Sequence, residues 1–294
     1  MRIIPFLCIA AALALPSYGQ LFRLTREQMI RYTAKNPFER FVDGRPKVPE
    51  RILEKVKAMS VEEAWGILQQ RGYRHQYAGD FQILHPGQKL VGRAFTAQYV
   101  PMRPDLAEAL EADAKAQGLP SSTNQKVIDQ LQLNDVPVID LMGFAPGHNF
   151  GGDNLQMAVW AATRTGAVVD GTIRDLDGIF DIPSQIYFRK AHPAAVSEVS
   201  VIGINVPVRI GDAIVLPGDV VLGDREGVIF IPPHLAEEIV KAADLTHIHD
   251  EWTKMKFMTG QYKSSQIYGG PLSPELQKEY DAYVKKRLAE MQSK

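Results

Sequence analysis

One stretch, residues 151–177, constrains the fold of this chain more than any other part of the sequence. It reads GGDNLQMAVWAATRTGAVVDGTIRDLD, in which a glycine pair precedes apolar residues at helical spacing. We expect Gly166 to end this helix, because glycine takes the left-handed conformation of a helix exit at little cost. A buried-strand run at 167–169 follows, and then a turn that carries Asp170, Gly171, Arg174 and Asp175. The stretch therefore predicts a loop–helix–strand–loop unit whose polar ends meet.

The two polar ends of this unit indicate a site for a small acid and a metal ion. A helix that begins within 152–155 presents backbone N–H groups, which bind carboxylates and phosphates. The guanidinium of Arg174 can hold a carboxylate through two hydrogen bonds, and Asp175 is a natural ligand for a hard cation such as Mg²⁺. We do not expect Asp175 to pair with Arg174, because adjacent side chains diverge. From the residues alone, an ordinary helix N-cap near a surface Arg–Asp dipeptide is the alternative.

The first 19 residues have the pattern of a secretory signal peptide. Arg2 provides the positive start, residues 3–15 the apolar core, and residues 17–19 the small side chains that signal peptidase reads. The apolar run is short for a membrane span, and a retained N-terminal anchor is the alternative interpretation. Cys8, the only cysteine of the chain, lies in this segment, so the mature protein would have no disulfide. We expect an exported protein, periplasmic or secreted, that has no membrane contact after cleavage.

The charge balance argues against nucleic acid as a partner. The chain has 33 lysine and arginine residues against 34 aspartate and glutamate residues, and the basic residues are dispersed. Proteins that bind nucleic acid usually present a basic surface, so we expect no nucleic-acid partner. The sequence also contains no P-loop, no G-x-S-x-G nucleophile elbow and no H-E-x-x-H zinc motif.

Helical segments flank a central region of mixed structure. Residues 20–59 predict an N-terminal helical extension, with a helix expected at 25–35. Residues 60–243 alternate strands and helices before a series of short strands, which is typical of a mixed α/β domain, and we expect its last helix at 233–243. Residues 244–294 predict a helical tail.

Two helix starts carry clear capping signals. Ser60 is followed three residues later by Glu63, which is the pattern of a capping box. In the tail, Ser273 and Pro274 are suited to the N-cap and first position of a last helix. The apolar stripe of that last helix is thin, so it could dock on a neighbouring subunit or pack on its own chain.

Several sequence blocks, in this order, resemble the RraA-like family. This family includes the 4-hydroxy-4-methyl-2-oxoglutarate/4-carboxy-4-hydroxy-2-oxoadipate aldolases and the regulator of RNase activity A. The blocks are LVGRAFT at 90–96, the PVID strand, GGDNL at 151–155, DGTIRD at 170–175 and NVPVRIGDAIVLPGDVVLGDREGVIFIP at 205–232. The resemblance covers about 60–240, and several ordered blocks are more specific than one short motif.

The resemblance implies a fold and an assembly. Family members have a mixed α/β domain similar to the swivelling phosphohistidine (β/β/α) domain. They assemble as homotrimers or hexamers, with sites near the subunit interfaces. We therefore expect this domain, with helical extensions at both ends, in a homotrimer or hexamer.

The resemblance also implies an activity and the residues that perform it. Family aldolases are class II enzymes, which use a divalent cation, Mg²⁺ or Mn²⁺, to cleave a 4-hydroxy-2-oxo acid to pyruvate, and the same chemistry decarboxylates oxaloacetate. The backbone at Gly152, Asp153, Asn154 and Leu155 would bind the keto-acid end of the substrate. Arg174 would bind the same end, and Asp175 would hold the metal, partly through water.

One departure from the family pattern keeps a second hypothesis open. Active aldolases tend to have an acid three residues after the metal-binding aspartate, and that position is Gly178 here, with Asp177 one residue early. A non-catalytic RraA-like protein-binding module is therefore the alternative. Nearby, His148 could line the pocket or lie on the surface, and Asp170 could orient Arg174 or be an ordinary turn residue.

Overall fold

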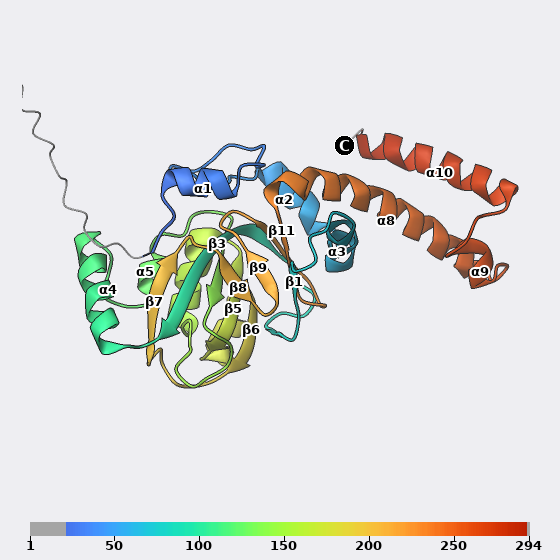
Figure 1. Ribbon diagram of the computed structural model, residues 1–294. Helices are drawn as coiled ribbons and strands as arrows, with labels where there is room; N and C mark the ends of the chain where they lie inside the picture. Colours follow the sequence, from blue (N-terminus) through green and yellow to red (C-terminus); the bar gives the residue numbers. More distant parts are fainter. Residues whose placement is uncertain (1–21, 293–294) are drawn as a thin grey trace, which may run out of the picture.

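The computed structural model of the protein describes residues 22–292. The predicted signal peptide and Cys8 lie outside the described residues. Within them the chain is a mixed α/β domain with a curled sheet at its centre and helices at both ends (Figure 1), which confirms the predicted fold class at this level. The likeness to the swivelling phosphohistidine domain stays a prediction. No helix within 22–292 has both the length and the apolar character needed to cross a membrane.

A nine-stranded sheet forms the centre of the described chain. Its path runs through β1 (Tyr77–Ala78), β11 (Val228–Ile231), β10 (Val220–Gly223), β3 (Leu90–Pro101), β4 (Asp135–Asp140), β5 (Gly166–Ile173), β6 (Gln185–Ala191) and β2 (Gln82–Ile83). A ninth strand, β7 (Val199–Ile204), pairs with the second half of β3. Strands β3 to β6 are parallel to one another, and the outer strands pair antiparallel.

The sheet curls until its two ends come near each other. Strands β1 and β2 stand at opposite ends of the path, yet only residues 79–81 separate them in the chain. Such a link reaches about 14 Å at most, because an extended residue spans about 3.5 Å. In a flat sheet, seven gaps of about 4.8 Å would place the two ends about 34 Å apart. The sheet must therefore bend into a half-open barrel.

The parallel strands at the centre are buried on both faces. Ile139 and Val169 point into an outer core, and their neighbours Val138 and Val168 point into an inner core. Continuous apolar runs of this kind are typical of parallel strands covered on both sides. The outer core is covered by α4 (Pro104–Ala116), α5 (Gln125–Ile128), α6 (Asp153–Thr163) and α7 (Leu176–Phe180). The inner core is closed by the hairpin of β8 (Val208–Ile210) and β9 (Ala213–Val215).

A third core lies where helices cover β10 and β11. These helices are α2 (Glu50–Lys57), α3 (Val61–Gln70) and α8 (Ala236–Met258). The capping box predicted at the start of α3 is confirmed. The Glu63 backbone N–H donates to Ser60 Oγ at 3.2 Å, and the Ser60 N–H donates to Glu63 Oε2 at 2.8 Å.

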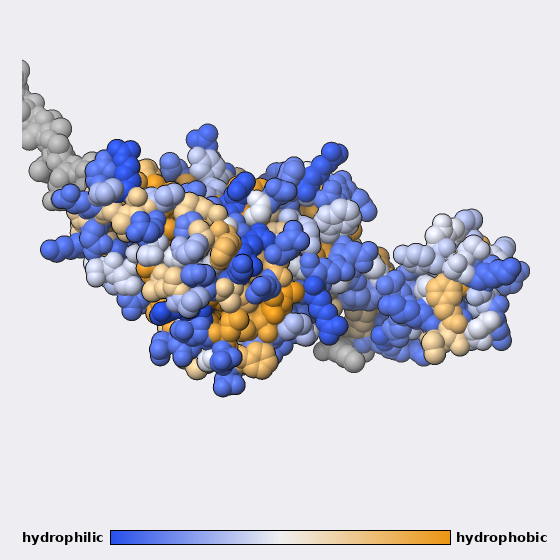
Figure 2. Space-filling view, turned by 90° about the horizontal axis from the view of Figure 1, so that it is seen from below, coloured by the Kyte–Doolittle hydropathy of each residue, from blue (hydrophilic) through white to orange (hydrophobic). Residues whose placement is uncertain are grey.

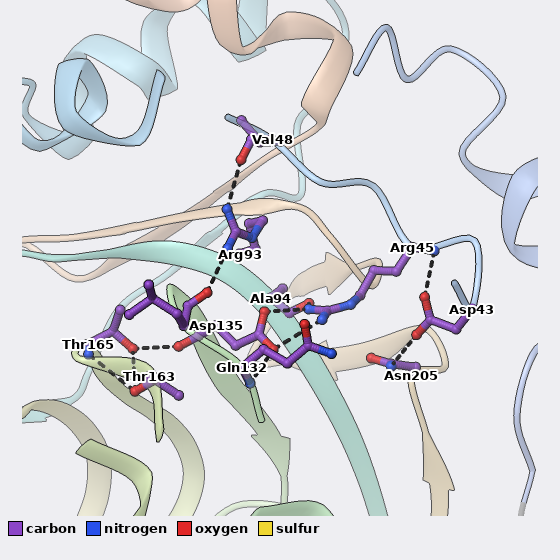
Figure 3. Close-up of polar contacts among 11 residues, drawn as sticks. Asp43, Arg45, Val48, Arg93, Ala94, Gln132, Asp135, Thr163, Thr165 and Asn205 are labelled. Carbon is purple, nitrogen blue, oxygen red and sulfur yellow. Dashed lines mark hydrogen bonds and ion pairs between the residues drawn. The ribbon is translucent and has the colours of Figure 1, made fainter. Parts of the chain in front are cut away.

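The N-terminal extension is attached to the sheet by a buried ion pair. It contains α1 (Arg26–Tyr32), the helix expected at 25–35, and then crosses the domain towards α2. The Arg45 guanidinium, only 1% exposed, donates to both oxygens of Asp135 on β4, at 2.7 and 3.0 Å (Figure 3). It also stacks on the Phe41 ring, 4.3 Å from the centroid. The extension is thus an integral part of the domain.

The C-terminal tail forms an arm that projects from the domain (Figure 1). After a 3₁₀ turn at Pro233–Leu235, α8 runs to Met258 as one helix, so our prediction that it ends at Ala243 was wrong. The composition becomes more polar after Ala243, but no glycine or proline interrupts the helix before it ends. The arm continues through α9 (Ser264–Ile267) to α10 (Pro274–Gln292).

The last helix packs against its own chain. α10 lies beside α8, and the Tyr280 ring contacts buried Trp252 with 5.1 Å between centroids. The other side of the arm is mostly hydrophilic, with one small apolar patch (Figure 2). Of the two roles considered for the thin apolar stripe, packing on its own chain is therefore the one observed.

Candidate functional site

The two ends of the 151–177 stretch lie side by side, as the sequence predicted. The Phe150 backbone N–H donates to the Thr172 carbonyl at 3.0 Å, and the Arg174 N–H donates to the Gly151 carbonyl at 3.4 Å. These bonds join the loop before α6 to the end of β5. The N-terminus of α6 and the residues that follow β5 consequently form one surface.

Gly152 and Asp175 are in direct contact within this surface. A Cβ atom at Gly152 would lie 1.9 Å from Asp175 Oδ2, so only glycine leaves room for the carboxylate. Asp175 has φ 59° and ψ 43°, a left-handed conformation that aspartate adopts more readily than most residues. The same conformation brings its Oδ2 to 3.6 Å from Arg174 Nε. Our expectation that these adjacent side chains diverge was therefore wrong.

Arg174 and Asp175 are accessible to a ligand. Their side chains are 38% and 46% exposed. Apart from the ion pair with Asp175, the Arg174 guanidinium bonds to none of the described residues, so its two terminal nitrogens are available. A planar guanidinium in this state can hold a carboxylate through two parallel hydrogen bonds.

The start of α6 supplies backbone donors beside this pair. Gly152 is the N-cap residue, and it provides no side-chain cap. Asp153 Oδ1 accepts from the Asn154 N–H at 2.7 Å, so that donor is occupied. The N–H groups of Asp153 and Leu155 belong to the first turn, which a helix leaves without intrahelical partners. The Leu155 side chain packs on the outer core and holds this turn in place.

The Asp153 carboxylate lies beside Gly178. A Cβ atom at Gly178 would be 2.8 Å from Asp153 Oδ2, so an acid at position 178 would collide with Asp153. Asp177 is exposed on the first turn of α7. The acid next to position 178 in this chain is therefore Asp153, for which the sequence had suggested only a backbone role.

A buried chain of polar side chains supports the glycine loop. Tyr99 Oη donates to Asn124 Oδ1 at 3.1 Å, and Asn124 Nδ2 donates to the Asn149 carbonyl at 3.0 Å. Asn149 Oδ1 then accepts from the Gly151 N–H at 2.7 Å. Sequence reasoning missed Tyr99 and Asn124, because each lies at least 25 residues from the next member of the chain and no local pattern links them.

Two predictions within the stretch were wrong. α6 ends at Thr163, and Arg164 rather than Gly166 takes the left-handed conformation, with φ 58°. Gly166 instead begins β5, where a Cβ atom would lie 1.8 Å from the Gln185 carbonyl oxygen. The expected turn also begins later than predicted: Asp170 and Gly171 belong to β5, which continues to Ile173 through a shift of register, and only Arg174 and Asp175 lie after the strand.

Asp170 and His148 lie next to this region, and the structure corrects the prediction for Asp170. Asp170 is 5% exposed and accepts from Arg189 Nε at 2.5 Å, so it neither orients Arg174 nor lies in a turn. Its register neighbour on β4 is Asp140, and burial raises the pKa of the Asp140 carboxyl, with a further increase from Asp170. His148 is half-buried beside Thr172, and its Nδ1 has no partner among the described residues.

The donor set is compatible with a hydrated divalent cation. Within residues 22–292 no group of three or more histidine, cysteine, aspartate or glutamate side chains is placed to hold a metal ion. Mg²⁺, however, often binds proteins through one or two carboxylates and keeps several waters. The half-exposed Asp175 carboxylate, with the Arg174 guanidinium beside it, meets that requirement. The residues present therefore fit such an ion.

Comparison with known proteins points to one family. The model of the RraA-like family, described as Aldolase/RraA, matches residues 52–230. A protein of Halalkalibacterium halodurans, provisionally named a 4-hydroxy-4-methyl-2-oxoglutarate aldolase, is 32% identical over 126 residues, 43% of this chain and 60% of the relative. The 4-hydroxy-4-methyl-2-oxoglutarate aldolase of Thermus thermophilus is 27% identical over 108 residues, 37% of this chain and 65% of the relative. The chain thus spans less than two thirds of the length of either relative.

A solved structure matches a larger part of the fold. Streptomyces coelicolor RraAS2, described as an unusual member of the RNase ES inhibitor RraA protein family, aligns with a TM-score of 0.60 and 27% identity. The alignment covers 76% of this chain and 100% of RraAS2. The segment before residue 52 and the helical arm lie outside the match to the family model.

Proposed function

Because this chain belongs to the RraA-like family, we propose that it is a metal-dependent lyase that cleaves a small 4-hydroxy-2-oxo acid to pyruvate by a retro-aldol reaction. The observation that carries the proposal is the contact of Gly152 with the Arg174–Asp175 pair. It brings an arginine, a carboxylate and the start of a helix onto one accessible surface. Aldolases among the relatives support the reaction class.

We assign the carboxylate end of the substrate to Arg174 and the start of α6. The free terminal nitrogens of Arg174 would grip the C1 carboxylate, and the N–H groups of Asp153 and Leu155 would bind oxygens at the same end. Together these donors fix the substrate so that its C3–C4 bond lies over the site. Pre-positioning of this kind lowers the entropic part of a reaction barrier.

We assign the divalent cation, Mg²⁺ or Mn²⁺, to Asp175. When bound, such a cation stabilises the negative charge that develops on the 2-oxo oxygen. In the reaction the 4-hydroxyl group loses its proton, the C3–C4 bond breaks, and its electron pair moves to C3 and the 2-oxo oxygen. Protonation of C3 then yields pyruvate, and C4 becomes a carbonyl carbon. Oxaloacetate decarboxylation would use the same residues.

Asp153 places a carboxylate beside position 178, where active family members tend to have an acid and this chain has glycine. Its carboxylate lies where a side chain at 178 would start. We propose that it hydrogen-bonds the water molecules around the cation, the supporting role that neighbouring carboxylates have at metal sites.

Because the surface is open, we also propose that a neighbouring subunit of a homotrimer or hexamer covers it. Export to the periplasm or beyond remains part of the proposal.

Pyruvate release from a 4-hydroxy-2-oxo diacid with Mg²⁺ tests the reaction. We expect turnover in wild type, its loss with EDTA, and a fall in kcat/KM of about 100-fold or more in Asp175→Ala, as expected when an electrostatic group of the transition state is removed. Asp177→Ala, which removes an exposed aspartate two residues away, should retain nearly full activity. Full activity in Asp175→Ala, or turnover that EDTA does not affect, would contradict the mechanism.

A non-catalytic protein-binding role is the second candidate, favoured by Gly178 and by the similarity to RraAS2. Calorimetric titration with Mg²⁺ and pyruvate separates the two candidates. Binding of both, weakened about tenfold for pyruvate in Arg174→Lys because the bidentate contact is lost, supports the lyase. If neither Mg²⁺ nor pyruvate gives a heat of binding, the result supports the protein-binding module.

A further inference from the structure

A cavity lies between the N-terminal extension and the wall of the barrel. Its volume is about 450 Å³, a size typical of small-molecule sites. One wall is the end of α1 and the loop after it, residues 31–36, and the other is formed by β9 and the segments around β10 and β11. Tyr32 and Ile214, which line it, are 50% and 48% exposed, so the cavity leaves apolar surface uncovered.

The cavity is distinct from the Arg174–Asp175 site. None of the residues of that site lines it. The wall at 31–36 and the lining residues 232–234 lie outside the part of the chain that the family model matches. The cavity is therefore built partly from segments outside that match.

The inner end of the cavity carries a buried carboxylate. Asp219 is 3% exposed, and its Oδ2 accepts from the Leu216 N–H at 2.8 Å. No donor among the described residues bonds to its other oxygen, Oδ1. Burial raises the pKa of this carboxyl to about 7, which reflects how little water reaches it. Oδ1 is not among the buried side-chain atoms that lack a partner, so it opens to the cavity, where a ligand donor can reach it and form a hydrogen bond to a charged group.

Basic and aromatic side chains also line the cavity. Arg31 and Lys35 come from the extension, whereas Asp219 is the only acid in the lining. Tyr73 Oη and His234 Nε2 are 3.1 Å apart, and burial together with nearby Lys35 lowers the pKa of His234. The wall that carries Arg31 and Lys35 thus favours a negatively charged group.

We propose that this cavity binds a small organic acid with an apolar body and a hydroxyl group at the end opposite its carboxylate. The hydroxyl donates to Asp219 Oδ1, the body packs on Tyr32, Ile214 and Leu216, and the carboxylate lies towards Arg31 and Lys35. The cavity is therefore a second ligand site, separate from the one proposed at Arg174 and Asp175, and its ligand has an apolar body between two polar ends.

Two probes of equal shape test the hydroxyl contact. 4-Hydroxybenzoate and 4-methylbenzoate differ only in the group that would face Asp219, and their binding can be measured by ligand-observed NMR at pH 8. We expect wild type to bind the hydroxyl probe about tenfold or more tightly, because a hydrogen bond to a charged group is lost with the methyl probe. Asp219→Asn keeps an acceptor for the Leu216 N–H but presents an amide N–H to the cavity, so the hydroxyl can only accept from a neutral group and the preference should fall several-fold.

Cavity-filling variants locate the binding. Ile214→Trp and Ala34→Trp fill the space from opposite walls, and each should abolish binding of both probes. Met258→Trp is the matched control, because Met258 is 88% exposed at the far end of α8 and should leave binding unchanged. If thermal melts show that one filling variant does not fold, the other filling variant provides the test of binding. Equal affinity for the two probes in wild type, no binding at millimolar concentration, or binding that survives filling would overturn the proposal.

Discussion

Gly166 shows how strongly one residue can be constrained by close packing. It begins β5, and an added Cβ atom would lie 1.8 Å from the Gln185 carbonyl oxygen on the neighbouring strand. The obstacle is backbone and cannot rotate away. Glycine at this position is therefore required by the distance between β5 and β6, and not by a positive φ angle as its place after a helix suggested.

Alanine at this position should separate the two strands. We expect Gly166→Ala to lower the free energy of unfolding by about 3 kcal/mol or more, a large value caused by overpacking. Gly66 is the matched control, since it lies within α3 and an added Cβ there meets no atom within 4 Å. Gly66→Ala should raise stability by about 0.5–1 kcal/mol through helix propensity. Urea unfolding of both variants measures the difference, and similar values would refute this account.

Asp219 should make stability depend on pH. Its folded-state pKa of about 7 is above its unfolded value, so the native state keeps a proton that the unfolded state releases. The stabilisation due to this proton is fully present below about pH 4 and is lost as the pH rises to about 7.

Asp219→Asn removes this titration while it keeps the shape of the side chain. We expect the stability of wild type relative to Asp219→Asn to fall by about 2 kcal/mol between about pH 5 and pH 8. Denaturant unfolding at the two pH values measures it. A flat difference for Asp219→Asn would mean that the carboxylate is ionised throughout.

At the scale of elements, the N-terminal extension depends on the Arg45–Asp135 pair (Figure 3). Both side chains are almost fully buried, and the pair connects a segment without regular structure to the first residue of β4. Removal of the arginine leaves a buried carboxylate without its main partner. A buried charge of this kind costs more than the pair itself contributes.

Arg45→Met should therefore destabilise the protein by about 3–5 kcal/mol. Arg51→Met is the control, because the Arg51–Glu237 pair is 66% and 55% exposed and should contribute no more than about 1 kcal/mol. The double variant Arg45→Met/Asp135→Leu should be more stable than Arg45→Met alone, since no unpaired charge remains. If Arg45→Met and Arg51→Met unfold at the same urea concentration, the buried pair is not what attaches the extension.

At the scale of the whole molecule, the helical arm is separate from the cores of the domain. Only the first half of α8 packs on the core beneath α2 and α3, through residues such as Ile239 and Ala243. Beyond it, α8 is covered by α10, which contributes to none of the three cores. The domain should therefore fold without the last two helices.

A chain that ends at Thr259 tests this independence. Its thermal midpoint should stay within about 4 °C of wild type, which corresponds to about 1 kcal/mol for a domain of this size. Trp252 is fully buried and touches Tyr280, so its fluorescence should shift to longer wavelength when α10 is absent. Loss of cooperative unfolding in the shortened chain would show that the arm stabilises the domain.

Sequence alone was sufficient wherever the decisive contact is local. The capping box of Ser60 and Glu63 joins residues three apart, and the α6 start and Arg174–Asp175 motifs belong to one stretch. The continuous apolar runs within β4 and β5 likewise indicated buried strands. Such signals lie within a few residues of one another, so the order of residues is enough to read them.

Tertiary structure decided every feature that depends on residues far apart in the chain. These features include the closure of the sheet, the burial of Arg45 against Asp135, and the cavity around Asp219. At the candidate site, the sequence identified Gly152, Arg174 and Asp175, but only the fold placed the Asp153 carboxylate beside Gly178. The physical reason is that a contact between distant residues depends on how strands and helices pack, and no local periodicity or propensity records that packing.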